Sequence, residues 1–577
     1  MNPFKYMLAQ SVSSSFDYVI ARSTSSYLLT ALFFSFGINI LYLAAPIYML
    51  QVYDRVIPSS SVVTLVMLTL VMLLAFLTLA ALDVVRAYVL TRAGIRLDAV
   101  MGERVFAAIV DRLADQAARS QPLRDLDQFR QTITGPGIHA LLDLPWAPVY
   151  LGLIFILHPG LGAFALGSAV LLLGLAYLNE LAVHGPLSEA NKAGVRSYGF
   201  SEMSFRNAEA IRAMGMLKGL LQRWRRDRNQ MLERQKYASD RASAISGLIR
   251  FSRMAMQSLI LGLGAYLVIN RSITGGAMFA AMILLGRALQ PIEQLVGSWR
   301  GLVAARDSYR KLQGLLDGYN PVRSDVKLPA AEGHVSVEAA TYVPPGVSYP
   351  VLRNISFEVK AGEAIGIIGP SGAGKSTLAR LLIGVIAPTQ GFVRLDGSEV
   401  AKWPRAELGV CIGYLPQDVE LFDDTVAANI SRFQMRNDNA IIEAARLAGV
   451  HDIILRLPQG YDTKLGEGAA VLSGGVRQRI GLARAVFGGP SLVLLDEPSS
   501  NLDADGDAAL LACLEELKKR GTTIFLVSHR PGTISVTDKL LVLKDGMVQV
   551  FGPRAEIMAR LTARAPVPLR AVPTPSH

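Results

Sequence analysis

Long apolar runs recur along the N-terminal half of the chain. Four of them approach the ~20 residues that a membrane-spanning helix needs; they lie at 27–50, 61–82, 251–270 and 275–298. A fifth run, 144–178, is apolar except at His158-Pro159-Gly160. A single helix cannot continue through this break, so the run predicts a hairpin of two spans. A re-entrant pair is the alternative, because the first half is short. The preferred count is six spans.

The pattern changes in the C-terminal half. From about Val335, short β-branched runs alternate with helical patterns and are separated by Gly and Pro. This alternation indicates βαβ units and a largely parallel sheet. The final stretch, 565–577, has four prolines and no apolar period, so it is predicted to be disordered.

Composition supports a membrane protein. The chain has 577 residues, of which 51% are hydrophobic, and its mean hydropathy is positive. The two cysteines, Cys411 and Cys513, form no CxxC pair, so neither a disulfide framework nor a zinc site is indicated. A net charge of +11 fits either nucleic-acid binding or the positive-inside bias, and the location of the charge favours the latter. No nucleic-acid partner is expected.

Loop charge predicts the orientation. The short connections between spans carry only Arg55 and Arg271, whereas the long segments 83–143 and 179–250 are basic. Lys and Arg accumulate on the cytoplasmic side, so both termini are expected there, and the long segments are expected to extend the spans as helices. The basic cluster within 223–236 is interpreted as a solvated helix face, with contact to anionic membrane lipids as the alternative.

A glycine-rich loop is the clearest chemical motif. Gly369–Thr377 matches G-x-x-x-x-G-K-[ST] and lies between a predicted strand, 364–368, and a helix. Glycines allow successive N–H groups to point at phosphate oxygens, and Lys375 can reach the β- and γ-phosphates. The Ser376 hydroxyl can bind Mg²⁺. The alternative is a purely structural role, in which the glycines form a turn that binds no ligand. The residues expected to contact ATP are Gly369, Ser371, Gly372, Gly374, Lys375, Ser376 and Thr377.

An apolar run ending in two carboxylates supplies the second motif. Ser491–Pro498 reads as a buried parallel strand that delivers Asp496 to its C-terminal end, where ligands bind in open α/β sheets. Asp496 is the expected Mg²⁺ partner. Glu497 can polarise a water for attack on the γ-phosphate.

Together with Leu472-Ser-Gly-Gly475, these motifs resemble the ATPase domain of ABC transporters. The resemblance implies contacts to ATP from Ser473 and Gly475, and one departure is Val476, where many members have glutamine. Other residues match in the family's order. They are Tyr342 as the adenine-stacking aromatic, Gln417 as the Mg²⁺-sensing catalytic glutamine, Asp503 in the D-loop and His529 as the switch histidine. A lone histidine that ends a strand would otherwise be structural.

The resemblance also implies an assembly and a fold. Each ATP in this family lies between the phosphate loop of one domain and the signature motif of another, so a homodimer is expected. The fold expected is an α-helical six-span domain fused to an α/β P-loop ATPase. The predicted divisions are a cytoplasmic segment at 1–26, the spans with cytoplasmic helix extensions at 27–315, a linker at 316–334, the nucleotide-binding domain at 335–564 and the tail at 565–577.

The membrane half resembles type I secretion ATPases, notably at Ala45–Pro58 and Gly286–Gln294. Only about 26 residues precede the first span, as in the alkaline-protease/lipase exporter branch, which lacks a peptidase-like domain. This implies export of an unfolded protein with a C-terminal signal across the bacterial inner membrane. The implied partners are a periplasmic adaptor and an outer-membrane channel. The alternatives are a lipid, drug or peptide exporter and a non-transport ABC ATPase that acts on nucleic acid.

Two arginines fall inside predicted spans. An intramembrane arginine that faces lipid is costly, so Arg287 is expected to line the conduit or brace a helix contact. The alternative is that it snorkels or pairs structurally, with Glu293 as the candidate partner. Arg253 lies near the start of span five. Two segments midway along the cytoplasmic extensions, Asp125–Arg130 and Phe205–Arg212, are the predicted contacts to the ATPase domain.

Overall fold

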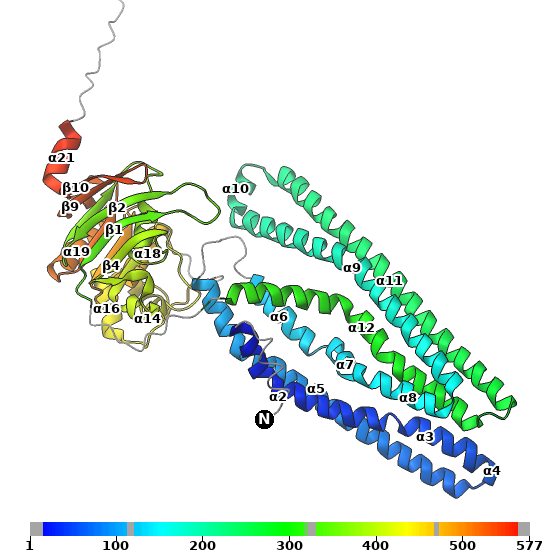
Figure 1. Ribbon diagram of the computed structural model, residues 1–577. Coiled ribbons are helices and arrows are strands. Elements are labelled where there is room, and N and C mark those ends of the chain that lie inside the picture. The colour runs from blue at the N-terminus through cyan, green and yellow to red at the C-terminus, as the bar shows by residue number, and fades with distance from the viewer. Residues whose placement is uncertain (1–14, 112–120, 318, 320–330, 467–471, 564–577) are drawn as a thin grey trace, which may run out of the picture. The chain divides into compact units, whose positions relative to one another are not determined.

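Figure 1 presents the computed structural model, which describes residues 15–111, 121–317, 319, 331–466 and 472–563. The chain divides into two compact units, Met1–Tyr319 and Asn320–His577. The predicted disordered tail and most of the predicted linker lie outside the described residues.

The first unit is entirely helical in its described part and holds six helical segments that are long and apolar enough to cross a membrane. The predicted count is therefore confirmed. The first segment is built from α2 (Ser15–Leu41), α3 (Ala44–Gln51), the π-helix η1 (Val52–Val56) and α4 (Ile57–Ser59). The other five are α5 (Val62–Asp111), the run α7 (Pro136–Asp143), η3 (Leu144–Trp146) and α8 (Ala147–Leu157), then α9 (Pro159–Arg206), α11 (Leu217–Ile269) and α12 (Gly275–Leu316).

The predicted hairpin at 158–160 is also confirmed. Helix α8 ends at Leu157 and α9 begins at Pro159. His158 caps the second helix, because its Nδ1 accepts a hydrogen bond from the Gly160 amide at 3.0 Å. Pro159 at the first helical position has no amide hydrogen to leave unpaired. The short apolar half is lengthened by α7 and η3 to a 22-residue segment, so the re-entrant alternative is not needed.

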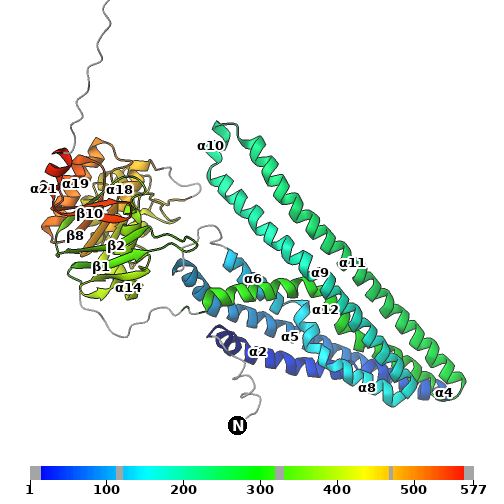
Figure 2. The ribbon, with the colours of Figure 1, turned by 45° about the horizontal axis from the view of Figure 1, so that its top comes forward.

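The long basic segments do form helices that continue the spans. Helices α9 and α11 lie side by side and are joined through the short α10 (Ala208–Ala213) (Figures 1 and 2). The predicted contact segment Phe205–Arg212 runs from the end of α9 into α10. The other predicted contact segment lies in α6 (Gln121–Ile133). There Asp125 is buried, accepts a hydrogen bond from Ser308 and pairs with Lys311. The side chain of Asp125 therefore packs against α12. Contact of either segment with the ATPase unit stays a prediction.

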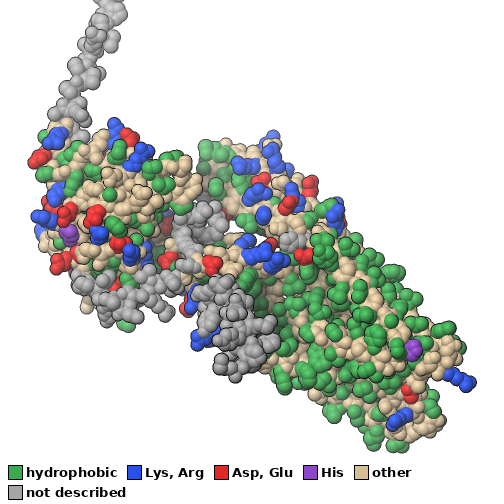
Figure 3. All heavy atoms as spheres, viewed as in Figure 1, with side chains coloured by type: hydrophobic (Ala, Val, Ile, Leu, Met, Phe, Trp, Pro, Cys, Tyr) green, Lys and Arg blue, Asp and Glu red, His purple; other side chains and the backbone are tan. Residues whose placement is uncertain are grey.

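The outer surface of the first unit is apolar. Large side chains of α5 such as Leu70, Leu74 and Leu77 are exposed, and Figure 3 shows a broad apolar field over this unit. Inside, α8, α9, α11 and α12 share an apolar core that includes Ile154 and Leu285. An apolar exterior around an apolar interior is what a lipid-embedded helix bundle requires.

A polar cluster centred on Asp143 ties three helices together. Oδ1 of Asp143 accepts hydrogen bonds from Arg86 Nη1 at 2.8 Å and Asn39 Nδ2 at 2.9 Å, and a third from Ser35. Nη2 of Arg86 pairs with Asp83 at 2.7 Å. Ser35 and Asn39 belong to α2, Arg86 to α5 and Asp143 to α7. Because Arg86 is buried, its positive charge needs these carboxylates as counter-ions.

Replacing Asp143 with alanine is therefore expected to destabilise the membrane domain. The change leaves the Arg86 guanidinium with only Asp83, and breaking a buried ion pair costs about 3–5 kcal/mol. The measurement is the thermal unfolding midpoint of the detergent-solubilised protein, which should fall clearly. Asp127→Ala is the matched control, since its side chain is 54% exposed and its pair with Arg130 is worth at most about 1 kcal/mol. Equal midpoints for the two variants would contradict the structural role of Asp143.

The two intramembrane arginines have other partners than the pairing of Arg287 with Glu293 that the sequence offered as an alternative. Glu293 does not pair with Arg287; it pairs with Arg253 of α11, with 2.5 Å between Oε2 and Nε. Arg287 instead stacks on Tyr42, 3.7 Å from the ring centroid, and donates to Gln290 Oε1 at 3.1 Å. The sequence placed Arg287 and Glu293 on one helix but gave no information about which neighbouring helix faces Glu293.

The second unit contains two sheets. The six-stranded sheet has the order β10-β9-β3-β8-β7-β6, in which all neighbours from β9 to β6 are parallel. These strands are β3 (Ala364–Ile368), β6 (Ile412–Leu415), β7 (Leu492–Asp496), β8 (Thr523–Val527), β9 (Lys539–Lys544) and β10 (Met547–Pro553). Every residue of β7 and β8 is buried, as expected for parallel strands covered on both faces.

The smaller sheet corrects part of the predicted βαβ pattern. It has the order β2-β1-β4-β5 and is antiparallel. Its strands are β1 (Val335–Tyr342), β2 (Leu352–Val359), β4 (Gln390–Leu395) and β5 (Ser398–Glu399). The connection between β1 and β2 is too short for a parallel crossover, which takes a dozen or more residues, so these strands pair as a hairpin.

Helices surround the parallel sheet, and two apolar clusters form the core. One includes Leu378 and Leu494, and the other includes Ile480 and Leu495. The helices are α13 (Lys375–Leu382), α14 (Arg405–Cys411), α15 (Val426–Ile430), α16 (Asp438–Leu447), α17 (His451–Leu455), α18 (Gly474–Val486), α19 (Ala504–Lys519), α20 (Pro531–Ile534) and α21 (Arg554–Ala563), with 3₁₀ turns η4 (Val400–Lys402) and η5 (Gly460–Asp462).

Candidate active site

The chemically distinctive residues follow the carboxyl ends of four adjacent strands. Strands β3, β8, β7 and β6 are neighbours in that order and run parallel. The glycine-rich loop follows β3, His529 follows β8, Asp496 ends β7 and Gln417 follows β6. Because parallel strands end at the same edge of a sheet, these groups gather where open α/β sheets bind ligands.

Backbone geometry in the loop requires glycine at defined points. A Cβ on Gly369 would lie 2.1 Å from the Leu543 carbonyl oxygen, so no side chain fits there. Gly374 caps α13 with φ +96°, a left-handed conformation that glycine adopts without strain. The loop thereby turns directly into the N-terminus of α13, whose unpaired amides favour an anion.

Lys375 begins α13 and folds back over the loop. Its Nζ is buried and donates to the carbonyl oxygens of Gly369 at 2.9 Å and Pro370 at 3.0 Å. Ser376 and Thr377 are half-buried in the first helical turn, and Ser371 is exposed on the loop. The lysine charge is therefore held at the centre of the loop by neutral acceptors.

Asp496 is a buried carboxylate with an unsatisfied atom. It is 3% exposed, and its Oδ1 has no hydrogen-bond partner in the described part of the chain. Burial raises the pKa of Asp496, while a hydrogen bond from the Ser376 hydroxyl opposes the rise. An orphaned buried oxygen beside a serine hydroxyl is a donor pair suited to a hard cation such as Mg²⁺.

Glu497 occupies a strained position next to it. Its φ is +51°, and its amide donates to Val527 of β8 at 2.9 Å. Gln417 Nε2 donates to Glu497 Oε2 at 3.2 Å, and His529 Nε2 lies 3.9 Å from Oε1. Such left-handed non-glycine residues cluster at active sites. The structure thus brings together the three residues predicted to be catalytic.

The signature segment forms the start of α18. Ser473 caps the helix by accepting from the Val476 amide at 3.4 Å. A Cβ on Gly475 would lie 3.1 Å from the Asn501 carbonyl oxygen, so a side chain there would crowd the D-loop. The Val476 side chain takes no part in this cap, because only its backbone amide is used.

Two further predicted residues have structural surroundings that the sequence did not reveal. Asp503 caps α19 by accepting from the Gly506 amide at 2.9 Å and pairs with Arg479 at 2.7 Å. These hydrogen bonds, that from Gly506 first, lower the pKa of Asp503. Tyr342 ends β1 and is half-buried against the core that also contains Leu378 of α13.

Gln478 is a site residue that the sequence analysis missed. It is 2% exposed, and its Nε2 donates to the Glu497 and Pro498 carbonyls at 3.2 and 2.6 Å. Its Oε1 accepts from the Asn501 amide at 3.0 Å. Gln478 therefore fixes α18 to the turn that carries Glu497. A signal was present, because Gln478 precedes the buried Leu482 by four residues and so lies on the core face of the helix.

Comparison with known proteins agrees with this geometry. The family described as "ABC transporter" matches residues 352–500, and "ABC transporter transmembrane region" matches 28–291. The fold resembles a bacterial Atm1-family ABC exporter with ATP bound, with a TM-score of 0.79 and 23% identity over 93% of this chain and 96% of that one. The spans and the site thus define an ATP-binding ABC transporter whose nucleotide hydrolysis is coupled to transport.

More specific relatives are secretion proteins. The chain is 41% identical to the type I secretion system ATP-binding protein PrsD of Rhizobium meliloti over 528 residues, 91% of each chain. It is 27% identical to the cyclolysin secretion/processing ATP-binding protein CyaB of Bordetella pertussis over 92% of this chain and 75% of that one. The chain belongs to the type I secretion family of ABC transporters and is a multi-pass protein of the bacterial inner membrane. This finding favours protein export over the lipid, drug or peptide alternative.

Proposed function

We propose that two copies of this chain form a homodimer that hydrolyses ATP at two shared sites to export a protein. The proposal rests on how the contacts of the site residues are divided. In the described part of the chain, Glu497 contacts Gln417 and His529, whereas the contacts of Ser473 and Gly475 run to Val476 and Asn501. Because these contacts do not tie the signature segment to the phosphate loop of the same copy, the segment can contact the ATP that is bound by a second copy.

The loop and the strand ends divide the work of binding ATP. The glycine-shaped turn presents backbone amides to the phosphates, and Lys375 exchanges its carbonyl partners for phosphate oxygens. Tyr342 stacks on the adenine. Ser473, Gly475 and Asp503 of the second copy cover the opposite side of the nucleotide.

The same edge of the sheet suits a magnesium ion. Ser376 and Asp496 supply oxygens, and the unpaired Oδ1 of Asp496 is the atom that favours this assignment. Gln417 reaches the site from β6. When bound, Mg²⁺ would neutralise charge on the β- and γ-phosphates.

Glu497 positions the attacking water. Its carboxylate, held between Gln417 and His529, is fixed in direction before the water arrives. His529, whose Nε2 lies 3.9 Å from Glu497 Oε1, is placed to contact the γ-phosphate. A preorganised carboxylate of this kind contributes about 10²–10⁴-fold to proton-transfer catalysis.

The transported substrate is a polypeptide that is unfolded and carries a C-terminal signal. The secretion functions named for PrsD and CyaB support a protein as the substrate. The exporter works with a periplasmic adaptor and an outer-membrane channel. Both termini face the cytoplasm, and membrane lipids surround the spans.

Mixing two inactive variants tests the shared site. Lys375→Ala removes the phosphate-loop cation, and Ser473→Arg blocks the signature serine. Each variant alone is expected to be inactive, but a mixed dimer contains one intact site, formed by Lys375 of one copy and Ser473 of the other. Random pairing then restores roughly a quarter of wild-type ATPase activity. Mixed Lys375→Ala and Glu497→Gln is the control, since both changes affect the same half-site. Activity in that control equal to the first mixture, or no recovery in the first mixture, would contradict a shared site.

A further inference from the structure

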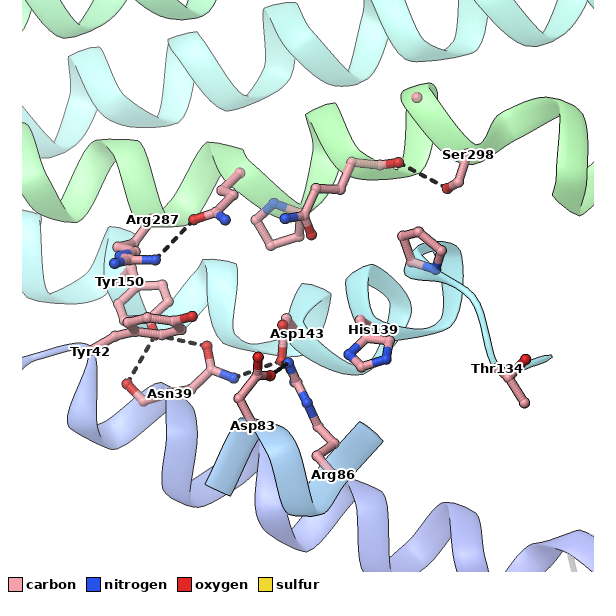
Figure 4. A pocket seen from close by; sticks show the side chains of 15 residues that line it. Asn39, Tyr42, Asp83, Arg86, Thr134, His139, Asp143, Tyr150, Arg287 and Ser298 are labelled. Atoms are coloured by element: carbon pink, nitrogen blue, oxygen red, sulfur yellow. Dashed lines mark hydrogen bonds and ion pairs between the residues drawn. The ribbon is translucent and has the colours of Figure 1, made fainter. Parts of the chain in front are cut away.

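A polar cavity lies within the helices of the membrane domain. Its volume is about 740 Å³, in the range of ligand-binding pockets. Figure 4 shows side chains from several helices converging on it. Those that matter most are Asn39, Tyr42, Arg86, Asp143, Arg287 and Gln290.

One wall of the cavity has no excess positive charge. Arg86 has two carboxylate partners, Asp83 and Asp143, and Tyr150 donates to Asn39 Oδ1 at 2.8 Å. A single donor of Arg86, the buried Nε, lacks an acceptor in the described part of the chain. This wall has no spare positive charge for a strong anion site.

The opposite wall carries a positive charge without a counter-ion. Arg287 of α12 stacks on Tyr42 and donates to Gln290, both of which are neutral. Among the described residues, no acidic side chain lies within 4.0 Å of Arg287 as an ion-pair partner. Glu293, one turn and a half along α12, is taken by Arg253. A guanidinium in a membrane span that lacks a carboxylate marks a functional site.

The groups beside Arg287 suit a polypeptide. Gln290, Gln294 and Asn39 carry amide side chains, which both donate to and accept from peptide groups. Pro291 also lines the cavity. As a helix-interior proline it has no amide hydrogen to donate to the carbonyl of Arg287, four residues earlier.

We propose that this cavity binds a carboxylate of the transported polypeptide, with Arg287 as the cation that receives it. The proposal rests on the proposed export of a protein and specifies the acidic side chain as the chemistry recognised. Arg287 can form a bidentate pair with a carboxylate while Gln290 and Gln294 hold the neighbouring peptide groups. A phospholipid headgroup is the competing occupant. The amide-rich lining favours a peptide, because Asn39, Gln290 and Gln294 can both donate to and accept from peptide groups, whereas a phosphate group only accepts.

Peptide binding to the full-length dimer in phosphatidylcholine nanodiscs tests the proposal. The probes are a fluorescent glycine-serine peptide that carries aspartates and its twin with asparagines, both amidated at the C-terminus. Wild type is expected to bind the aspartate peptide at least about tenfold more tightly, the value of one charge-assisted pair. Arg287→Gln should abolish this preference and Arg287→Lys should retain part of it. Gln290→Glu supplies an internal carboxylate next to Arg287 and should also abolish it.

Arg250→Gln is the matched control. It removes an arginine of α11 whose side chain is 73% exposed and which does not line the cavity, so the preference should persist. Equal binding of the two peptides to wild type overturns the carboxylate assignment but leaves protein export standing. Absence of binding by either peptide also overturns the carboxylate assignment, while export of a signal-bearing polypeptide is tested separately by transport. A preference that survives Arg287→Gln overturns the role of Arg287. The protein could instead retain phosphatidylglycerol in a way that depends on Arg287 and that the aspartate peptide does not reverse. That result assigns the cavity to lipid and overturns the proposal.

Discussion

Replacing Glu497 with glutamine is expected to lower ATP turnover by at least about 100-fold while ATP still binds. The amide keeps the size of the side chain and its contacts to Gln417 and His529 but removes the charge that polarises water. The measurement is steady-state phosphate release together with nucleotide binding. Glu516→Gln is the control, since Glu516 pairs with Arg520 on the far end of α19 and should leave turnover unchanged.

The same variant should accumulate a closed dimer in ATP. Hydrolysis is the step that releases two domains joined through shared nucleotides, so blocking it holds them together. Size-exclusion chromatography or cross-linking with ATP would detect this state. Turnover at the wild-type rate would mean that a group other than Glu497 positions the water.

Replacing Lys375 with alanine is expected to abolish turnover and to weaken ATP binding by about 10–100-fold, the value of a lost charge-assisted hydrogen bond. The change also frees the carbonyls of Gly369 and Pro370, which Lys375 Nζ holds at 2.9 and 3.0 Å. Titration with a fluorescent ATP analogue measures the affinity. Lys402→Ala is the control, because it removes an exposed lysine that pairs with Glu399. This variant should bind ATP with the affinity of the wild type. Full hydrolysis by Lys375→Ala would exclude the phosphate-loop assignment.

The ATPase core was predictable from local pattern. Buried β-branched runs that end in the glycine-rich loop, in Asp496 and in Ser528-His529 identify parallel strands, and parallel strands necessarily end at one edge. Proximity of Gln417 to Glu497 then depends only on the adjacency of β6 and β7. What the pattern left out was the antiparallel pairing of β1, β2 and β4, because alternating apolar strands look alike whichever way their neighbours run.

Residues that act through tertiary contacts were harder to predict. Gln478 looked like part of a polar signature helix, but its role comes from carbonyl groups about 20 residues further along the chain. The partners of Arg253 and Arg287 depend on which helix faces which in the bundle, and hydropathy contains no such information. For the same reason the contacts of Asp125 to Ser308 and Lys311 of α12 could not be predicted, and contact of its segment with the ATPase domain stays a prediction.

ATP-dependent transport of a polypeptide into inside-out vesicles that contain the purified chain and its adaptor directly measures whether ATP hydrolysis drives protein export. The wild-type protein is expected to carry an unfolded polypeptide with a C-terminal secretion signal into a protease-protected space when ATP is added. Glu497→Gln and Lys375→Ala vesicles should give no protection. Protection that appears without ATP, or that persists in both variants, would contradict the claim that this site drives export.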